Sequence, residues 1–285
     1  MSSTNPGDAA IGVAINANIT AIFSEAMDAS TITTATITLK QGATDVPGAV
    51  TYVGTTATFN PTSNLAVNTV FTATVTIGVK DLAGNALASD YAWTFTTGTT
   101  ADTTAPTVNS TDPANAATGV AINRNIAATF SEAMDAATIT TSTFTLTQGA
   151  TSVAGAVTYA GTVATFNPTS DLAANTVYTA TITTGAKDLA SNALAVNKTW
   201  SFTTGTTADI TAPDVSSTIP ADVATGIAVN ANITATFSEA MDPLTITTAT
   251  ITLKQGATVV SGAVTSPSTT TATFNPTSNL ANNTT

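Results

Sequence analysis

Phe23-Ser-Glu-Ala-Met-Asp28 recurs without change as Phe130–Asp135 and again as Phe237–Asp242. Successive copies of this hexapeptide begin 107 residues apart. Repeats of about 20 to 50 residues build solenoids or propellers, in which each unit leans on its neighbours. A unit of about 100 residues can bury a core of its own. The period therefore predicts a tandem array of autonomous domains.

Other motifs follow in the same order within each repeat. Phe59-Asn-Pro-Thr-Ser63 returns at Phe166 and at Phe274, and Asp81-Leu-Ala-Gly-Asn85 returns as Asp188-Leu-Ala-Ser-Asn192. The repetition thus covers the whole unit and is not confined to one short motif.

The third repeat is one residue longer than the second in one place. The interval from Val264 to Phe274 is 10 residues, against 9 from Val157 to Phe166. A slip of one residue inside a strand would turn its side chains to the opposite face. The insertion is therefore expected in a turn.

The composition excludes most catalytic chemistry. The chain has neither cysteine nor histidine, and so has no thiol or imidazole nucleophile, no histidine base and no zinc site of the usual kind. We therefore predict that it is not an enzyme. Its 17 acidic and 6 basic residues give a net charge of −11, which disfavours binding to nucleic acid or to an anionic membrane. No apolar run approaches the roughly 20 residues of a membrane span.

Apolar residues alternate with threonine in the central repeat. Ile126, Ala128 and Phe130 share one side of their segment, and threonine suits the solvent side of a strand. Turn residues separate such segments at the spacing of a β-sandwich. The predicted strands span residues 106–109, 125–130, 143–147, 156–159, 163–166, 178–182 and 199–203.

Three turn signals have a defined chemistry. Asp135, and its counterpart Asp242 directly before Pro243, are typical caps of a single helical turn. Asp188–Asn192 suits a tight turn in which asparagine or glycine takes a positive φ. Tyr178 has the spacing of the corner in which a tyrosine hydroxyl bonds back to the preceding backbone of an immunoglobulin-type sandwich. The first repeat has phenylalanine at the corresponding position and cannot make that bond.

These motifs, taken in order, resemble the bacterial Ig-like domain of the S-layer (SbsA-like) type. The resemblance rests on Ala-Pro-Thr-Val at the entry, Phe-Ser-Glu-Ala-Met-Asp, Phe-Asn-Pro, Tyr-Thr-Ala-Thr-Ile, Asp-Leu-Ala-x-Asn and a closing Trp-x-Phe-Thr-Thr-Gly, and it covers essentially the whole chain. It implies an all-β chain of tandem Ig-like Greek-key sandwiches in a secreted or surface-attached bacterial protein. It implies no catalytic residues.

Three domains are expected, at residues 1–101, 102–208 and 209–285, and they are called the first, second and third repeats below. Only the second is complete: the first is expected to lack its first strand and the third its last two. Two explanations are open. The chain is a fragment of a longer array, or a neighbouring molecule donates the strands that the exposed edges lack.

The linkers are rich in threonine and end in Pro106 and Pro213, a composition that favours extended backbone. Sandwiches joined in this way predict an elongated array. With about 3.3 Å for each strand residue, the array would be on the order of 100 Å long.

The repeated acids are the candidate metal ligands. Calcium takes several carboxylate and carbonyl oxygens. The candidates are the hexapeptide acids, represented by Glu132 and Asp135, and the linker acids Asp102 and Asp209 together with the turn acid Asp188, which could form a clamp between domains. The alternative is that the acids cap turns and solvate the linker, and no other cofactor is predicted.

The sequence favours a non-catalytic spacer that extends and presents other domains outside a bacterial cell. The alternatives are a module that itself recognises glycan or protein, ice binding as part of a larger adhesin, and self-association through exposed strand edges into a filament or surface layer. The expected partners are therefore neighbouring domains of a longer chain, a cell-surface glycan or protein, or further copies of the same chain. The few aromatic residues fall at core-facing positions, which weighs against a glycan site.

Overall fold

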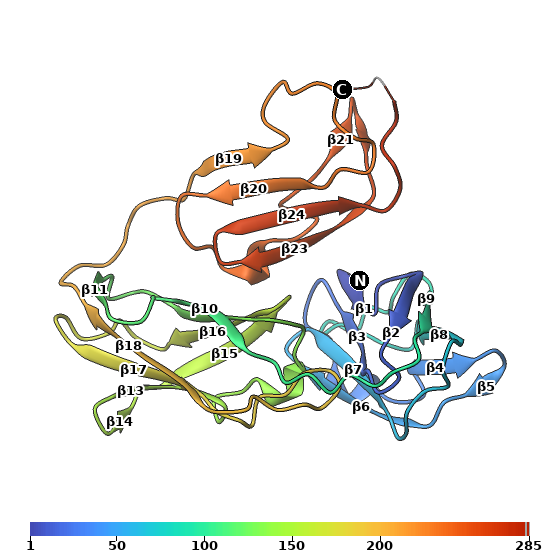
Figure 1. Ribbon diagram of the computed structural model, residues 1–285, viewed down its shortest axis with the longest axis horizontal. Coiled ribbons are helices and arrows are strands. Elements are labelled where there is room, and N and C mark those ends of the chain that lie inside the picture. The colour runs from blue at the N-terminus through green and yellow to red at the C-terminus, as the bar shows by residue number, and fades with distance from the viewer. Residues whose placement is uncertain (283, 285) are drawn as a thin grey trace. The chain divides into compact units, whose positions relative to one another are not determined.

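The computed structural model describes residues 1–282 and 284, and its regular structure is almost entirely strand (Figure 1). The chain divides into two compact units. Unit 1 comprises Met1–Pro106, Met134–Ile139 and Thr184–Ala195, and unit 2 comprises Thr107–Ala133, Thr140–Thr183 and Val196–Thr285. The domain boundaries set after residues 101 and 208 remain predictions, and the end of the third predicted domain, at residues 283 and 285, lies outside the described part. None of the helices in the described residues is long and apolar enough to cross a membrane.

The first repeat, in unit 1, is a sandwich of two sheets. One sheet has the order β1-β3-β7-β6 and the other β2-β9-β8-β4-β5. Its elements are β1 (Ser3–Asn5), β2 (Ala10–Val13), β3 (Ile19–Ile22), η1 (Ala29–Thr31), β4 (Ile37–Gln41), β5 (Thr44–Asp45), β6 (Gly48–Val53), β7 (Thr56–Pro61), β8 (Val70–Val75) and β9 (Tyr91–Thr97).

The core of this sandwich follows the alternation that the sequence shows. Along β8, Phe71, Ala73 and Val75 are buried, and along β9 Trp93 and Phe95 are buried, while their neighbours in the chain are more exposed. The paired strands bring Phe71 opposite Phe95, and their rings stack with centroids 5.7 Å apart. Period-two patterning therefore places one face of each sheet in the core.

The second repeat has the same topology, and its strands lie in unit 2. Its sheets have the orders β10-β12-β16-β15 and β11-β18-β17-β13-β14. The strands are β10 (Val108–Asp112), β11 (Ala117–Val120), β12 (Ile126–Phe130), β13 (Phe144–Gln148), β14 (Thr151–Ser152), β15 (Gly155–Ala160), β16 (Val163–Pro168), β17 (Val177–Ile182) and β18 (Lys198–Thr204). The 3-10 turn η2 (Ala136–Thr138) belongs to unit 1. The all-β sandwich prediction is confirmed, with β11 and β14 added to the seven predicted strands.

The added strand β11 is the parallel partner of β18, as β2 is of β9. Each of these short strands has a register shift within it, and Gly12 and Gly119 take positive φ there. The ladder closes where Gly98 N donates to Val13 O at 2.8 Å. The second strand of each of these two repeats is thus hydrogen-bonded to the last strand of the same repeat.

The first strand of the first repeat is shortened and not missing, so that prediction was wrong. Thr4 pairs with Ala21 in β1, as Thr111 pairs with Ala128 in β10. Ser3–Asn5 suffices for this ladder, because the pairing needs backbone groups and not the Ala-Pro-Thr-Val segment.

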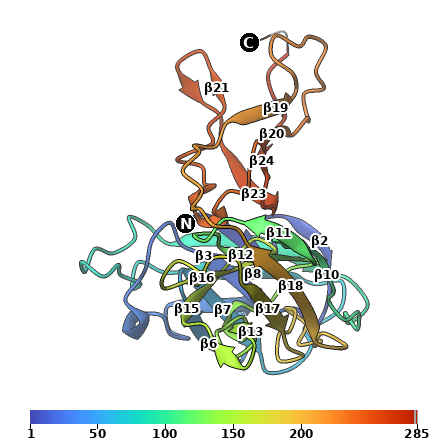
Figure 2. The same cartoon turned by 90° about the vertical axis from the view of Figure 1, so that its left-hand side faces the viewer.

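The third repeat, in unit 2, forms the sheet β19-β20-β24-β23 and a separate pair β21-β22, and Figure 2 shows β21 outside that sheet. Its elements are β19 (Val215–Ile219), β20 (Ile233–Phe237), η3 (Pro243–Thr245), β21 (Lys254–Gln255), β22 (Thr258–Val259), β23 (Gly262–Ser268) and β24 (Thr271–Pro276). Residues Ile233–Phe237 are half-buried, whereas Ile126–Phe130 are fully buried. In the second repeat the facing sheet includes β17 and β18, which have no counterpart among the described residues of the third.

The extra residue of the third repeat lies inside β23, so its expected place in a turn was wrong. Thr265 pairs with Thr273 and Ser268 with Thr271, with an irregularity between these pairs. The two-residue connection to β24 keeps its length. A bulge absorbs one residue locally, so that the rest of the strand keeps its facing side chains.

Candidate functional site

Two turns lie together at one end of each of the first two repeats. The amide of Asp28 donates to the carbonyl of Lys80 at 2.8 Å, and the amide of Asp135 donates to that of Lys187 at 2.8 Å. The first turn of each pair is the 3-10 turn that follows the hexapeptide, and the second is the Asp-Leu-Ala-x-Asn turn. The motifs that recur most strictly in the sequence therefore meet in space.

The hexapeptide aspartates cap the 3-10 turns, as predicted. Asp28, Asp135 and Asp242 each accept a hydrogen bond from the amide two residues later, at 2.9, 3.0 and 3.0 Å. Their environments differ. Hydrogen bonds from Ser30 lower the pKa of Asp28, whereas burial raises that of Asp135. The burial is explained by η2, which lies against β6 and β7 in unit 1.

The aspartate of the second turn is occupied by its own turn. Asp188 Oδ1 accepts from the amides of Ala190 and Asn192, both at 2.8 Å, and Oδ2 accepts from Asn192 Nδ2 at 2.9 Å. Asp81 makes the same three contacts in the first repeat, and these bonds lower its pKa. The expected positive φ is found at Gly84 and at Ser191, so in the second repeat serine, and not asparagine or glycine, takes it.

The linker is tied to the repeat that precedes it. In unit 1, Asn16 Nδ2 donates to Asp102 O at 2.9 Å and Asn16 Oδ1 accepts from Asp102 N at 2.8 Å. In unit 2, Asn123 makes the same pair of bonds with Asp209, at 2.9 and 2.8 Å. The sequence reasoning missed both asparagines, although their spacing of 107 residues was a usable signal.

Unit 1 also contains a contact between the Asp188–Asn192 turn and the first repeat. Asn18 N donates to Leu189 O at 2.8 Å, and Asn192 Nδ2 donates to Asp102 O at 3.2 Å. Asn16 Nδ2 also approaches Ala190 O, at 3.4 Å. Leu189 is 9% exposed, whereas its equivalent Leu82 is 76% exposed. Docking therefore covers the leucine of this turn.

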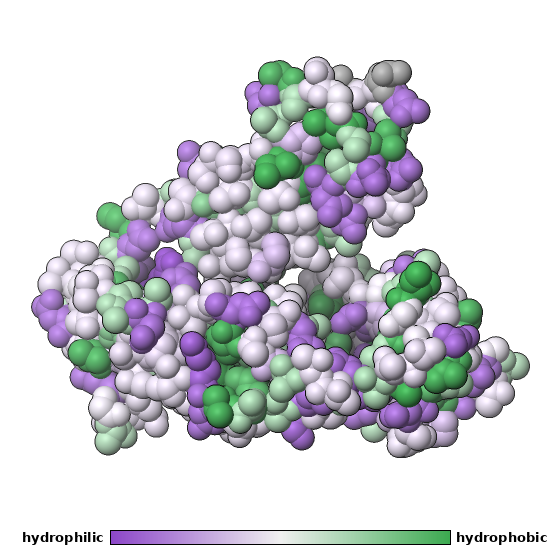
Figure 3. Space-filling view, in the orientation of Figure 1, coloured by the Kyte–Doolittle hydropathy of each residue, from purple (hydrophilic) through white to green (hydrophobic). Residues whose placement is uncertain are grey.

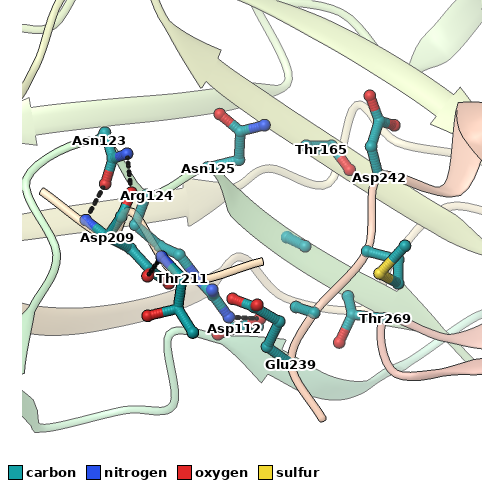
Figure 4. A pocket seen from close by; sticks show the side chains of 13 residues that line it. Asp112, Asn123, Arg124, Asn125, Thr165, Asp209, Thr211, Glu239, Asp242 and Thr269 are labelled. Carbon is teal, nitrogen blue, oxygen red and sulfur yellow. Dashed lines mark hydrogen bonds and ion pairs between the residues drawn. The ribbon is translucent and has the colours of Figure 1, made fainter. Parts of the chain in front are cut away.

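Unit 2 contains a hollow at the corresponding place, with a volume of about 230 Å³ (Figure 4). Its walls are mostly polar and include four acids, Asp112, Asp209, Glu239 and Asp242, with Arg124 paired to Asp112 at 2.6 Å. The lining residues are Asp112, Asn123, Arg124, Asn125, Ala127, Thr165, Asp209, Thr211, Glu239, Ala240, Met241, Asp242 and Thr269.

The pKa values of two neighbouring carboxyls in this hollow are shifted in opposite directions. Loss of solvent and the neighbouring carboxyl of Asp209 raise the pKa of Glu239. The hydrogen bond from the amide of Thr211, at 2.9 Å, lowers the pKa of Asp209.

A family model for a bacterial Ig-like domain matches the chain three times, at residues 1–97, 102–204 and 209–285. The chain belongs to the bacterial Ig-like domain family. The resemblance inferred from the sequence motifs is thereby confirmed. No curated protein matches the chain.

Several solved structures match the chain at low similarity. The N-terminal part of the bacterial S-layer protein SbsC is 14% identical, with 70% of this chain and 43% of that chain covered and a TM-score of 0.29. A structure of domains 1–6 of the same protein is 14% identical, with 97% and 50% covered and a TM-score of 0.29. A chimeric titin Z1Z2 is 8% identical, with 70% and 93% covered and a TM-score of 0.31. The chain thus spans half or less of the S-layer structures that it matches, and likeness at this level does not extend to what those proteins do.

The predicted calcium ligands are distributed over both units. Asp102 and Asp188 belong to unit 1 and place carboxylate oxygens within 4.8 Å of each other. Asp135 caps η2 in the same unit, whereas Glu132 and Asp209 belong to unit 2. Calcium takes six to eight oxygen ligands. At Asp188 it would compete with three N–H groups that already donate hydrogen bonds to the carboxylate. The calcium clamp remains a proposal.

The predicted tyrosine corner is present in the second Ig-like repeat, where Ala173 N donates to Tyr178 Oη at 2.8 Å. Trp93 and Trp200 are buried, and among the aromatic residues that the structure describes only Tyr91 is markedly exposed, at 39%. Figure 3 shows mainly residues of intermediate hydropathy on the face in view, with scattered hydrophobic and hydrophilic ones.

Proposed function

We propose that this chain is a non-catalytic structural module of a bacterial surface protein, which spaces and presents other domains outside the cell. Membership of the bacterial Ig-like family and the tandem arrangement support the surface role. The non-catalytic role does not follow from family membership. It rests on the hydrogen bonds that the polar side chains make within the chain.

The observation that carries this proposal is the structural use of the recurring polar residues. Asp81 and Asp188 each hold a turn closed with three hydrogen bonds. Asp28 and Asp135 cap 3-10 turns, and Asn16 fixes the linker at Asp102. Side chains that would have to reach a substrate are thus turned toward the chain's own backbone.

The strand pairing suits a module under tension. β11 is the second strand of the second repeat, after β10, and β18 is the last; β11 and β18 are parallel partners. Tension on the chain acts first on β10, which pairs with β12. Once β10 has detached, the tension draws β11 toward its N-terminal end and β18 toward its C-terminal end. Because the strands are parallel, these forces are opposite, so they load the hydrogen bonds in shear and together. A hairpin pulled open from one end would lose its bonds one at a time.

Force spectroscopy on the whole chain tests the mechanical role. The expected trace has discrete unfolding events, and a complete repeat releases roughly 300 to 350 Å of chain. The variant Gly205→Pro removes the amide hydrogen of residue 205, and with it the 2.7 Å hydrogen bond to Val120 O. That variant should lower the unfolding force of one repeat and leave the first repeat unchanged. A featureless extension, like that of an unfolded linker, would contradict the proposal.

Placement outside the cell needs its own experiment. Intact cells of the source bacterium are treated with a protease and probed with an antibody against the chain. Loss of the signal, with a cytosolic control protein left intact, is the expected result. Protection of the chain until the cells are lysed would exclude the extracellular placement. It would leave the proposed resistance to tension untested, because force spectroscopy measures that separately.

A further inference from the structure

The two end turns of the second repeat are more buried than the same turns of the first. Leu189 is 9% exposed, whereas Leu82 is 76% exposed. η2 contains the buried Ala136, whereas η1 contains no buried residue. The hexapeptides before these 3-10 turns are identical, and the Asp-Leu-Ala-x-Asn turns differ only at x. The difference in burial therefore comes from what surrounds the turns.

The first repeat surrounds both turns of the second. η2 lies against β6 and β7. Asn18 N donates to Leu189 O at 2.8 Å, and Asn192 Nδ2 donates to Asp102 O at 3.2 Å. All of these groups belong to unit 1. Two segments that the sequence assigns to the second repeat are therefore packed as part of the body that the first repeat forms.

The hydrogen bonds of this contact are made by neutral groups. Asp102 takes part through its backbone carbonyl, which accepts from Asn192 and also from Asn16. Its carboxylate accepts from the amide of Thr104 in the linker. Leu189 contributes a backbone carbonyl and a covered apolar side chain. Recognition of the turn thus depends on shape, apolar burial and hydrogen bonding.

Asn18 connects the contact to the core of the first repeat. Asn18 is 2% exposed, and the next residue, Ile19, begins β3 and belongs to that core. The amide that Leu189 O accepts is therefore held in place by the start of a core strand. If β3 loses its pairing, the turn loses this donor, although the hydrogen bonds inside the turn do not require it.

We infer that the Asp188–Asn192 turn is the element by which the second repeat recognises the repeat before it, and that the fold of the first repeat sets the stability of this turn. Local opening in a protein follows cooperative units of structure, which need not coincide with sequence repeats. The turn opens when β3 is lost, even while β17 and β18 remain paired. This inference does not depend on the proposed spacer role, because it concerns only folding.

Hydrogen exchange of the whole chain, followed for single amides by NMR, tests this dependence. In the wild type the amides of residues 188–192 should exchange at least tenfold more slowly than those of residues 81–85, although both turns have the same internal hydrogen bonds. Phe95 and Phe202 occupy equivalent core positions, and each is 1% exposed. Phe95→Leu should accelerate exchange at 188–192 more than Phe202→Leu does.

A matched pair of leucine substitutions tests the contact itself. Leu189→Glu should bring exchange at 188–192 to the rate of 81–85 and should remove the protection of the Asn18 amide. Leu82→Glu, which places the same charge on the exposed turn, should change neither. Circular dichroism first establishes that both variants are folded.

A milder pair of substitutions keeps the test independent of a buried charge. Asn192→Ala loses the bond to Asp188 inside the turn and the bond to Asp102, whereas Asn85→Ala loses only the bond inside its turn. Asn192→Ala should therefore accelerate exchange in its turn by a larger factor. In 1 M salt, where the Debye length is about 3 Å, the slow exchange at 188–192 should persist.

Four results would each overturn the inference. They are equally fast exchange of the two turns in the wild type, equal effects of Leu189→Glu and Leu82→Glu, equal effects of Asn192→Ala and Asn85→Ala, and a larger effect of Phe202→Leu than of Phe95→Leu on residues 188–192. Loss of the slow exchange in 1 M salt would show that charge, and not the neutral contact, holds the turn.

Discussion

Tyr178 Oη lies 2.8 Å from the amide nitrogen of Ala173 and accepts its hydrogen bond, whereas Phe71 fills the same buried position in the first repeat without a hydroxyl. The rings are otherwise alike in their surroundings. Phe71 stacks on Phe95 at 5.7 Å, and Tyr178 stacks on Phe202 at 5.8 Å. The two repeats therefore differ here by one hydrogen bond.

Adding that bond should stabilise the first repeat. Phe71→Tyr is expected to raise its free energy of unfolding by about 1 kcal/mol, and Tyr178→Phe to lower that of the second repeat by a similar amount. Urea denaturation followed by fluorescence of Trp93 or Trp200, one in each repeat, measures the two effects separately. The changes in unfolding free energy must have opposite signs for the two substitutions; changes of the same sign would contradict this explanation.

Ser191 takes a φ of 70°, where its counterpart Gly84 takes 87°. Residues with a β-carbon are strained in this region, and glycine is not. Ser191→Gly is therefore expected to stabilise the second repeat by roughly 0.5 to 1 kcal/mol, and Gly84→Ser to destabilise the first. Differential scanning calorimetry of both variants is the measurement, and a stabilising Gly84→Ser would refute the argument.

The caps Asp28 and Asp135 should respond oppositely to pH. The pKa of Asp135 is raised above the ordinary 3.8 by burial, so its contribution is fully present below the unfolded pKa and is lost as pH rises through the folded pKa. The pKa of Asp28 is lowered, so its contribution is present above the unfolded pKa and is lost as pH falls through the folded pKa.

Asparagine caps as well as aspartate but does not titrate. Relative to the wild type, Asp135→Asn should therefore gain stability as pH rises from about 3 to 7, and Asp28→Asn should lose it over the same range. Unfolding curves at several pH values, with Thr33→Ser as an uncharged control nearby, provide the comparison. If the stability of both variants changed with pH in the same direction, the opposite pKa shifts of Asp28 and Asp135 would be contradicted.

Gly155 lies where a β-carbon has no room. An added β-carbon would meet the ring of Phe166 and approach the carbonyl oxygen of Asn167 to 2.7 Å. Gly155→Ala should cost about 1 to 3 kcal/mol of unfolding free energy. Gly7→Ala is the control, because no atom lies within 4 Å of the added carbon there. Equal effects of the two substitutions in chemical denaturation would show that packing is not the cause.

Calcium should leave the thermal midpoint unchanged if the Asp188 carboxylate serves its own turn. Asp188→Asn should then destabilise the protein equally with calcium and with chelator. A midpoint that rises with calcium, and no longer does so in Asp188→Asn, would instead establish the calcium clamp with Asp102.

Much of the fold could be predicted from local sequence. Period-two segments gave strands such as β12 and β17, and Asp135 gave its 3-10 turn, because these features depend on neighbouring residues. β11 was missed because Ala117–Val120 does not alternate and pairs with a strand that is distant in the sequence. The bulge in β23 was missed because register depends on the partner strand.

The candidate site was harder to predict, for a physical reason. Asp81–Asn85 and Asp188–Asn192 are nearly identical in sequence and internal bonding, yet Leu82 is open and Leu189 is covered. Local sequence determines the shape of a turn, whereas its surroundings determine its burial. The asparagines at 16 and 123, which lie 107 residues apart, carried a periodic signal of the contacts with the linker.

The covered Leu189 gives the second repeat a different mutational tolerance from the first, whose turn faces solvent. A polar side chain at position 82 meets water, whereas at position 189 it would be placed against another part of unit 1. Nearly identical repeats would therefore drift apart during evolution according to whether this turn is covered. Exchanging one repeat for another by recombination would then not be neutral, even where their cores are interchangeable.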